Sequence, residues 1–483
     1  MLFTLPQVTA MRKTKIICTI GPATESAEML QKLADAGMNL VRLNLSHGDH
    51  ASHGEVMRRV HALNANRNHP VAIMVDTQGP EIRTGDLAHD MNLHDGDEIS
   101  VVPLGETDVE TTSIQVNYAD LITDVAVGDK ITLDNGLINL EVLSKGKRSM
   151  RCRVTDGGVL KSKRHVNLPG IRVNLPGITE KDKRDIVFAR EQGADFVALS
   201  FVRGAADIAQ ARELLGADCK VKLIAKIENQ EALTNIEQIV VAADGIMVAR
   251  GDLGVEIPIE FLPRVQRRIV RLCAVQGKRV IVATHMLESM IQNPTPTRAE
   301  VTDVANAVYE EADAIMLSGE TTVGKHPVRC VEMLDRIARS IENSRGLRFT
   351  DELILDDDKQ QVAAAAVKLA ESIGAHGIIV PTRSGRMANH VTSCHPQTPV
   401  ICAFTFDEQT RRQLVLNRNV LSYCIPHHDD PEAILAAAAA ILIERKEFSA
   451  NDKMVVLSDI LAGAGLGAIQ IRTLGELAAP RVR

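Results

Sequence analysis

The stretch 221–256 constrains the fold more than any other part of the chain. It contains two apolar runs, VKLIAKIE and GIMVARGD, and each run ends in charged residues. Between them, at about 230–242, apolar residues recur with the period of a helix, at Ala232, Leu233, Ile236, Ile239 and Val240. Strand, helix and strand in this order predict two parallel strands joined by a crossover helix. The charges lie only at the carboxyl ends of the strands, where α/β sheets bind ligands.

The charged residues of this stretch form a candidate site. Lys226 and Glu228 are two positions apart, so they point to the same side of their strand. We expect Asp252 at the end of the next strand, two residues after Arg250. Carboxylates at adjacent strand ends can hold a hard divalent cation such as Mg²⁺, and a lysine beside them can stabilise a developing anion. Gly251 lets the backbone approach a phosphate or carboxylate closely. The alternative is a structural ion-pair cluster.

The same rhythm recurs along the chain and predicts an α/β protein built on a (β/α)₈, or TIM, barrel. Eight apolar runs alternate with helical patterns, at 15–20, 40–45, 71–75, 196–201, 222–228, 245–250, 279–283 and 314–317. We therefore assign the barrel to 12–77 and 167–345. Between these parts, 78–166 shows short alternating segments with turn signals, including Asn135-Gly136, which predict an inserted β-barrel lid domain. Five further strands with helices predict a C-terminal α/β domain over 358–483.

Composition limits the partners. The 483 residues carry a net charge of −7 without a long basic run, which argues against nucleic acid and anionic membranes as partners. No run of about 18 apolar residues predicts a membrane span, and the first residues do not resemble a signal peptide. Eight cysteines without CxxC pairs are typical of reduced thiols in a cytoplasm, and we expect a cytoplasmic protein.

Polar segments follow all eight predicted strands, and together they resemble those of pyruvate kinase. The motifs TIGP, VRLNLSHG, DTQGPEIRTG, VNLPG, KIEN, MVARGDLGVEIP, ATHMLESM and LSGET occur in the order of that family. The inserted β domain also falls in the same place. The resemblance implies transfer of a phosphoryl group from phosphoenolpyruvate to ADP, giving pyruvate and ATP.

The resemblance also implies roles for residues at the barrel mouth. Lys226 would lie over the transferred phosphoryl group and stabilise the leaving enolate, while Glu228 and Asp252 would bind Mg²⁺ or Mn²⁺. Substrate contacts would come from Arg42, Ser200, Thr284 and the backbone amides around Arg250, Gly251 and Asp252. The proton that reaches the enolate would be transferred by Thr284, with Ser318 and Glu320 passing it through water. The K⁺ ligands of the family match Asn44, Ser46, Asp76 and Thr77, and Glu81 accompanies K⁺ dependence. His47, Arg83 and Arg164 match positions near the nucleotide phosphates.

Two departures from the family pattern concern the site. Arg164-His165 stands where the family usually has Lys-Gly, so the positive charge is kept on a forked side chain. His285 stands where the family usually has Gln, which places a titratable group next to Thr284.

A second site is expected in the C-terminal domain. Thr382, Arg383, Ser384, Gly385 and Arg386 follow a predicted strand and open a helix, which is favourable for an anion. They match the effector loop of the family, T-x-S-G-x-S, except that Met387 replaces the last hydroxyl. The segment 458–471 also lacks the turn that commonly closes over fructose 1,6-bisphosphate. We therefore expect a sugar monophosphate as activator of a homotetramer; the alternative is a helix N-cap that binds nothing.

Two other functions remain open from the residues alone. A lysine at a barrel strand end can form a Schiff base, as in aldolases, although Glu228 and Asp252 beside Lys226 favour the protonated amine. A non-catalytic metabolite sensor can keep the fold, although such proteins usually lose the lysine or a metal carboxylate.

Overall fold

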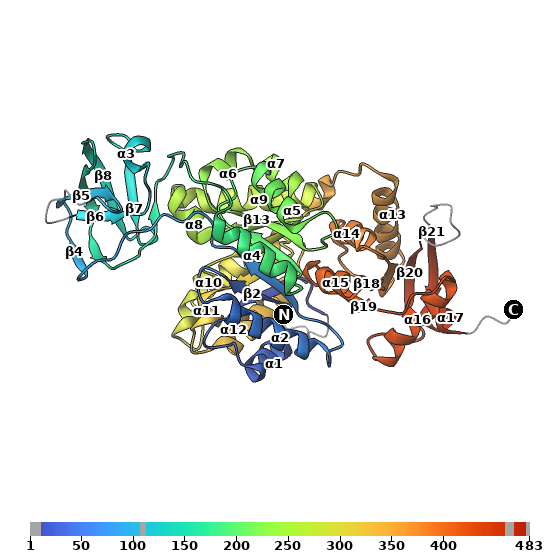
Figure 1. The fold of residues 1–483 in the computed structure, drawn as a ribbon. Helices are drawn as coiled ribbons and strands as arrows, with labels where there is room; N and C mark the ends of the chain where they lie inside the picture. The colour runs from blue at the N-terminus through green and yellow to red at the C-terminus, as the bar shows by residue number, and fades with distance from the viewer. Residues whose placement is uncertain (1–10, 107–112, 459–467, 480–483) are drawn as a thin grey trace, which may run out of the picture.

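The structure is a computed structural model that describes residues 11–106, 113–458 and 468–479. It has three parts, which Figure 1 shows in a row: the inserted β domain, the barrel in the middle and the C-terminal domain at the opposite side. Among the described residues, no helix is both long and apolar enough to cross a membrane.

Eight parallel strands close into the predicted barrel. Around the barrel their order is β1-β16-β15-β14-β13-β12-β3-β2. Their bounds are β1 (Lys15–Thr19), β2 (Leu40–Asn44), β3 (Ala72–Asp76), β12 (Phe196–Leu199), β13 (Lys222–Ile227), β14 (Gly245–Ala249), β15 (Arg279–Ala283) and β16 (Ala314–Leu317). The strands alternate between two clusters, because successive side chains point to opposite faces. One cluster packs against the helices, and the other, which includes Ile17, Ile224 and Met247, fills the barrel interior.

Helices surround the barrel. They are α1 (Ala27–Ala36), α2 (His50–Asn64), α4 (Glu180–Glu191), α5 (Ala205–Leu215), α6 (Gln230–Thr234), α7 (Ile236–Ala242), α9 (Leu262–Val275), α10 (Arg298–Tyr309) and α12 (Pro327–Ile341). Shorter turns are α8 (Arg250–Glu256), η1 (Ile259–Phe261), η2 (Glu288–Ile291), α11 (Gly319–Thr322) and η3 (Phe349–Glu352). The expectation of one helix over 230–242 is wrong. Asn235 interrupts it, with its side-chain Nδ2 donating to the carbonyl of Arg203 at 2.8 Å instead of facing solvent.

The inserted domain is formed mainly by a six-stranded sheet and a two-stranded sheet. Its elements are β4 (Met91–Leu93), β5 (Glu98–Pro103), β6 (Ser113–Val116), α3 (Leu121–Asp124), β7 (Lys130–Leu133), β8 (Ile138–Lys145), β9 (Met150–Asp156), β10 (Gly158–Leu160) and β11 (Val166–Asn167). The predicted hairpin at Asn135-Gly136 joins β7 to β8, and both residues have positive φ there. The domain has its own core, and Leu168, Val173 and Leu175, which follow β11, pack into it or against it.

The C-terminal domain has the five predicted strands in the order β19-β18-β17-β20-β21. They are β17 (Gly377–Pro381), β18 (Val400–Thr405), β19 (Val420–Cys424), β20 (Lys453–Ser458) and the antiparallel β21 (Ala468–Thr473). The helices are α13 (Asp358–Ser372), α14 (Arg386–Ser393), α15 (Glu408–Gln413), η4 (Leu414–Leu416), α16 (Pro431–Glu444) and α17 (Leu474–Ala478).

The C-terminal domain closes the base of the barrel. Val415 and Leu416 of η4 belong to the same buried cluster as the side chains of the barrel interior, such as Ile17 and Phe196. Next to them, Arg412 Nε donates to Asp195 Oδ1 at 2.9 Å, at the amino end of β12. The inserted domain leaves from the carboxyl end of β3, so the two appended domains lie at opposite ends of the barrel (Figure 1).

Candidate active site

Lys226 is the centre of a buried ionic cluster at the barrel mouth. It lies on the same face of β13 as Ile224, which fills the barrel interior. Its Nζ lies 2.9 Å from Glu228 Oε1, 3.2 Å from Asp76 Oδ1 and 2.6 Å from Ser200 Oγ. Burial alone would lower the pKa of Lys226, but Asp76 and Glu228 outweigh it and raise that pKa. The side chain is therefore an ammonium ion at neutral pH.

Asp76 joins this lysine to Arg42. Arg42 Nε donates to Asp76 Oδ2 at 2.6 Å, and its Nη1 donates to Thr19 Oγ1 at 3.2 Å. Burial would raise the pKa of Asp76, but Arg42 and Lys226 together hold it below its ordinary value. Asp76 is thus an ionised carboxylate that orients two cations. Thr19 was not among the predicted site residues, because only the pairing of β1 with β2 brings it beside Arg42.

Glu228 and Asp252 are two neighbouring carboxylates beside Lys226. Glu228 Oε2 accepts a hydrogen bond from the amide of Phe201 at 2.6 Å. Burial raises the pKa of Glu228 to about 7, against the lowering effect of Lys226, and Asp252 adds to the rise. Burial also raises the pKa of Asp252. Two neighbouring carboxylates whose charged forms are disfavoured in this way are a suitable pair for a cation.

The structure corrects the position of Asp252. The strand β14 ends at Ala249, and Arg250–Glu256 form the helix α8, so Asp252 lies in the first turn of a helix rather than at a strand end. The guanidinium of Arg250 does not enter the mouth either. Its Nη1 donates to Asp303 Oδ1 at 2.7 Å and its Nε to the carbonyl of Ala283 at 3.1 Å. Asp303, on another helix, pairs with this side chain, and the substrate contact expected from the backbone amides around Arg250 to Asp252 stays a prediction.

Thr284 and His285 adopt a rare backbone conformation. Both have left-handed φ values, 66° and 55°, which cost energy for residues other than glycine. Thr284 Oγ1 accepts a hydrogen bond from the amide of Gly251 at 2.7 Å and donates to the carbonyl of Ala283 at 2.6 Å. Arg250 Nη2 donates to the Thr284 carbonyl at 2.5 Å. The strained turn at Thr284 and His285, after β15, is thus fixed by hydrogen bonds from Arg250 and Gly251 of α8.

Ser318 and Glu320 follow β16. Glu320 is fully buried; its Oε1 accepts from the amide of Leu287 at 2.9 Å and its Oε2 from the amide of Ser318 at 2.7 Å. The buried hydroxyl of Ser318 has no hydrogen-bond partner among the described residues.

The four residues predicted as K⁺ ligands lie at the ends of two adjacent strands. Asn44 is the register partner of Asp76 across β2 and β3. Asn44 Oδ1 accepts from the amide of Ser46 at 3.2 Å, and the carbonyl of Thr77 accepts from Ser200 Oγ at 2.7 Å. The structure thus brings these residues to one side of the mouth.

The predicted nucleotide contacts lie apart from Lys226. Arg83 Nη2 is 2.7 Å from Glu81 Oε2, and Arg164 Nη1 is 3.4 Å from Asp134 Oδ1, both within the inserted domain or its connection. The amide of His47 donates to the carbonyl of Asn44 at 3.2 Å. In the described part of the chain, no contact joins the side chain of any of these three basic residues to Lys226.

The predicted effector loop lies at the start of α14. Its N-cap is Gly385, with a left-handed φ of 80°, and no side chain of the described residues caps this helix. The amide of Thr382 donates to the carbonyl of Phe404 at 2.7 Å, and the carbonyl of Arg383 accepts from Thr405 Oγ1 at 3.3 Å. Arg386 Nη2 is paired with Asp357 Oδ2 at 2.7 Å. Most of the segment predicted to close over a ligand, at 459–467, lies outside the described residues.

The comparisons with known proteins agree with this arrangement. Residues 11–331 match the barrel domain of pyruvate kinase, and residues 360–467 match the pyruvate kinase alpha/beta domain. The chain is 43% identical to the pyruvate kinase of Geobacillus stearothermophilus over 465 residues, which are 94% of this chain and 78% of that protein. It is 42% identical to plastidial pyruvate kinase 2 of Arabidopsis thaliana over 463 residues, covering 93% of this chain and 78% of that one. From its barrel mouth to its C-terminal sheet, the chain belongs to the pyruvate kinase family.

Proposed function

We propose that this chain transfers the phosphoryl group of phosphoenolpyruvate to ADP, giving pyruvate and ATP. The observation that carries the proposal is the buried Lys226 ammonium, 2.9 Å from Glu228 and 3.2 Å from Asp76, at the mouth of a pyruvate kinase barrel. Phosphoryl transfer requires alignment and charge neutralisation more than covalent help. A lysine that stays protonated meets this need, whereas a Schiff base needs a neutral amine.

The substrate's negative charge would be bound from two sides. Lys226 would face the bridging oxygen, where charge develops as the enolate leaves, and Arg42 would contact the phosphoryl oxygens. Asp76 keeps both cations in place through its two oxygens. Ser200 would line the same pocket, since its hydroxyl accepts from Lys226 and donates to the Thr77 carbonyl.

The carboxylates Glu228 and Asp252 fit a divalent cation. Within the described ranges there is no cluster of three or more His, Cys, Asp or Glu residues arranged for a metal. Mg²⁺, however, commonly takes only one or two carboxylates and completes its shell with water and substrate oxygens. Bound there, Mg²⁺ or Mn²⁺ would neutralise oxygens of the substrate. The raised pKa of Glu228, which stems from burial, also favours a site that gains a positive charge.

A K⁺ ion would bind beside this cation, at Asn44, Ser46, Asp76 and Thr77. All four supply hard oxygen ligands. Glu81, whose carboxylate pairs with Arg83 at 2.7 Å, adds no positive charge to the phosphoryl pocket. A monovalent cation would therefore supply the missing positive charge.

The enolate would receive its proton through Thr284. This hydroxyl now donates to the Ala283 carbonyl, so it must give up that bond to act as a donor to the substrate. Ser318 and Glu320 would hold a water molecule that replaces the proton, because the Ser318 hydroxyl is buried without a protein partner in the described structure.

ADP would bind between the barrel mouth and the inserted domain, which would act as a lid. Arg83 and Arg164 belong to that side, and closure would bring them to the phosphates, opposite His47. Both arginines now pair with acidic residues, at 2.7 Å and 3.4 Å, which the nucleotide phosphates would replace.

The loop of Thr382, Arg383, Ser384, Gly385 and Arg386 would bind a sugar monophosphate that activates a homotetramer. A left-handed Gly385 precedes α14, and within the described ranges the backbone amides at this helix terminus have no capping side chain, which is the arrangement an anion uses. The test is a panel of sugar phosphates at subsaturating phosphoenolpyruvate, with light scattering for the oligomer. Tight activation by fructose 1,6-bisphosphate would contradict the choice of ligand. No response, together with a silent Ser384→Ala, would leave the loop without a ligand.

A coupled assay tests the central proposal. The purified chain with phosphoenolpyruvate, ADP, Mg²⁺ and K⁺ should form pyruvate, which lactate dehydrogenase then reduces with loss of NADH absorbance. Omitting ADP is the control. If no pyruvate forms beyond the control, the chain does not catalyse this transfer.

A further inference from the structure

The segment Ser200–Arg203, which follows β12, touches both connections between the barrel and the lid. The outgoing connection passes it at Gly79. A Cβ atom on Gly79 would lie 2.9 Å from both Phe201 Cδ2 and Ser200 Cβ, and Gly79 has a φ of +74°. The amide of Gly79 donates to Asp182 Oδ1 at 2.9 Å. The chain is therefore fixed to the barrel up to this glycine.

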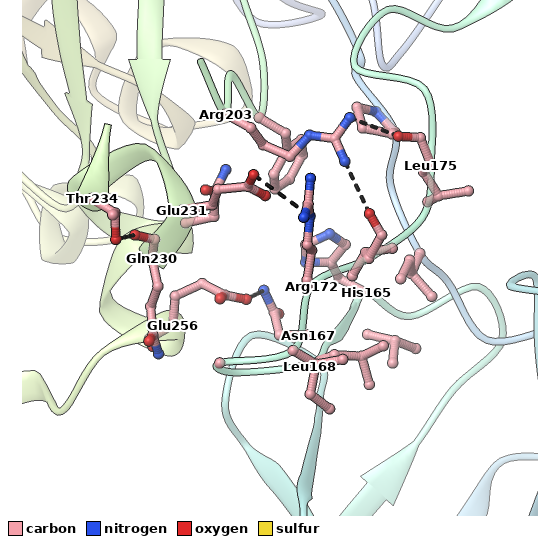
Figure 2. A pocket seen from close by; sticks show the side chains of 18 of the residues that line it. His165, Asn167, Leu168, Arg172, Leu175, Arg203, Gln230, Glu231, Thr234 and Glu256 are labelled. Carbon is pink, nitrogen blue, oxygen red and sulfur yellow. Dashed lines mark hydrogen bonds and ion pairs between the residues drawn. The ribbon is translucent and has the colours of Figure 1, made fainter. Parts of the chain in front are cut away.

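The returning connection is bound by Arg203. Its Nη1 donates to the carbonyl of Val173 at 2.9 Å and its Nη2 to the carbonyl of Leu175 at 2.6 Å. Figure 2 shows this guanidinium reaching across to Leu175. The bonds are directed at two alternate backbone carbonyls of the returning chain, so they depend on backbone geometry and not on the identity of the side chains. Fork-shaped donors of this kind hold a partner in both position and orientation.

The lid binds the opposite edge of the tripeptide Val173–Leu175, whose first and last carbonyls accept from Arg203. The amide of Asn174 donates to Tyr118 Oη at 2.8 Å, and Asn174 Nδ2 donates to Asp120 Oδ2 at 3.2 Å. Val173 and Leu175 also pack against the lid core. The tripeptide Val173–Leu175 is thus held by the lid through its amide and side chains, and by the barrel through its carbonyls.

Arg203 is itself fixed to the barrel. Its amide donates to Asp207 Oδ2 at 2.8 Å, and its carbonyl accepts from Asn235 Nδ2 at 2.8 Å. A Cβ atom on Gly177 would lie 2.0 Å from Asp207 Oδ1, so the returning chain lies against the barrel again at that residue. The chain passes from the lid to the barrel within Leu175–Gly177.

The other links across this junction are weaker. A cavity of about 530 Å³ lies between the returning connection and the barrel (Figure 2). At its rim, Arg172 is 3.9 Å from Glu231, and the Arg172 side chain is 87% exposed. Asn167 Nδ2 donates to Glu256 Oε1 at 3.1 Å. The cavity leaves space beside the connection, so movement of the lid is not blocked by packing there.

We propose that Arg203 is a positioning residue that forms the returning hinge of the lid. The moving body then extends from Ile82 to Leu175, and it turns about Gly79–Ile82 and Leu175–Gly177, with the Arg203 guanidinium close to the axis. The inference rests on the proposed closure of the lid over ADP. It also places the hinge next to the metal carboxylate Glu228, because the amide of Phe201, at φ +53°, donates to that carboxylate at 2.6 Å.

Three variants test the role. Arg203→Met removes both hydrogen bonds and keeps much of the side-chain volume, whereas Arg203→Lys can keep only one. Arg172→Met is the matched control. It removes an arginine that lines the same cavity, whose side chain is exposed and forms a long ion pair with Glu231. The readouts are the KM for ADP, the KM for phosphoenolpyruvate, kcat, and hydrogen–deuterium exchange of peptides spanning 170–178 and 138–156.

Arg203→Met should raise the KM for ADP about tenfold and exchange faster over 170–178 by a similar factor, because two charge-assisted hydrogen bonds are lost. The KM for phosphoenolpyruvate and exchange over β8 and β9 should stay near those of the unmodified protein. For Arg203→Lys, the KM for ADP and the exchange over 170–178 should lie between those of Arg203→Met and the unmodified protein. For the control Arg172→Met, both should match the unmodified protein.

Two results would overturn the assignment. One is unchanged exchange over 170–178 with an unchanged KM for ADP. The other is faster exchange of the whole chain, including 138–156, which would mean that Arg203 supports the fold and not the hinge. If the unmodified protein forms no pyruvate, the proposed function fails, and the exchange data still decide whether Arg203 fixes the connection.

Discussion

Replacing Lys226 by Met separates the catalytic and the structural effects of the buried ammonium. The substitution keeps the length of the side chain and removes its charge. On the proposed mechanism, the leaving enolate loses the cation that faces it. Loss of one preorganised electrostatic contact of this kind costs about 3 kcal/mol or more in transition-state stabilisation, which corresponds to at least a hundredfold drop in kcat.

The structural cost is smaller than for most buried ion pairs. Asp76 keeps Arg42 at 2.6 Å, and Glu228 keeps the amide of Phe201 at 2.6 Å. Burial already raises the pKa of Glu228 to about 7, so this carboxyl group can take up a proton when the lysine is absent. We therefore expect a loss of about 1–3 kcal/mol in the free energy of unfolding, the cost of an unsatisfied polar group, rather than the larger cost of an unpaired buried charge.

The measurements are the coupled pyruvate assay and denaturant unfolding at pH 7. Lys222→Met is the matched control, because Lys222 lies at the amino end of the same strand and its Nζ is 3.6 Å from Asp244. The control should keep its turnover. If Lys226→Met retains more than about a tenth of the original kcat, a loss far below that expected for such a contact, the role given to Lys226 is wrong.

Three further predictions concern other groups. Activity should fall at least about tenfold when K⁺ is replaced by tetramethylammonium, because Glu81 brings no positive charge to the pocket; full activity without K⁺ would refute this. Arg164→Ala should raise the KM for ADP or lower kcat, since closure would carry Arg164 to the phosphates, and unchanged steady-state kinetics would disprove it. Burial lowers the pKa of Lys15 to about 7 from 10.5, so the unfolded chain binds more protons between these values and stability should rise with pH there. The free energy of unfolding, measured from pH 7 to 10, should rise less steeply with pH for Lys15→Met than for the unmodified protein. An equal slope would contradict the prediction.

The barrel was predictable because the patterns that mark its strands and helices lie within short stretches of the sequence. Apolar runs with polar ends mark parallel strands, and parallel strands bring their carboxyl ends together. The spacing of Lys226 and Glu228 therefore placed them correctly on one face, 2.9 Å apart. The hairpin at Asn135-Gly136 followed from turn chemistry in the same way.

The features that were not predicted depend on distant partners. Arg250 turns away from the mouth because Asp303, on another helix, pairs with it. Asn235 breaks a helix whose apolar period continues through it, because it bonds to the carbonyl of Arg203 in another loop. Neither partner leaves a signal near the residue in sequence. The left-handed Thr284 was not predictable either, since a β-branched residue rarely adopts that conformation, and the left-handed His285 follows directly after it.

The seating of Val415 and Leu416 in the base of the barrel bears on the order in which the chain can finish folding. The last barrel strand ends at Leu317, well before these two residues are synthesised. Until they arrive, interior side chains such as Ile17 and Phe196 face an open base. Burial of the two late residues contributes about 3–6 kcal/mol, a large fraction of the net stability of a folded domain. We therefore expect a nascent barrel to expose apolar interior side chains until the C-terminal domain leaves the ribosome, and a chain that stops short of that domain should aggregate rather than persist as a smaller enzyme.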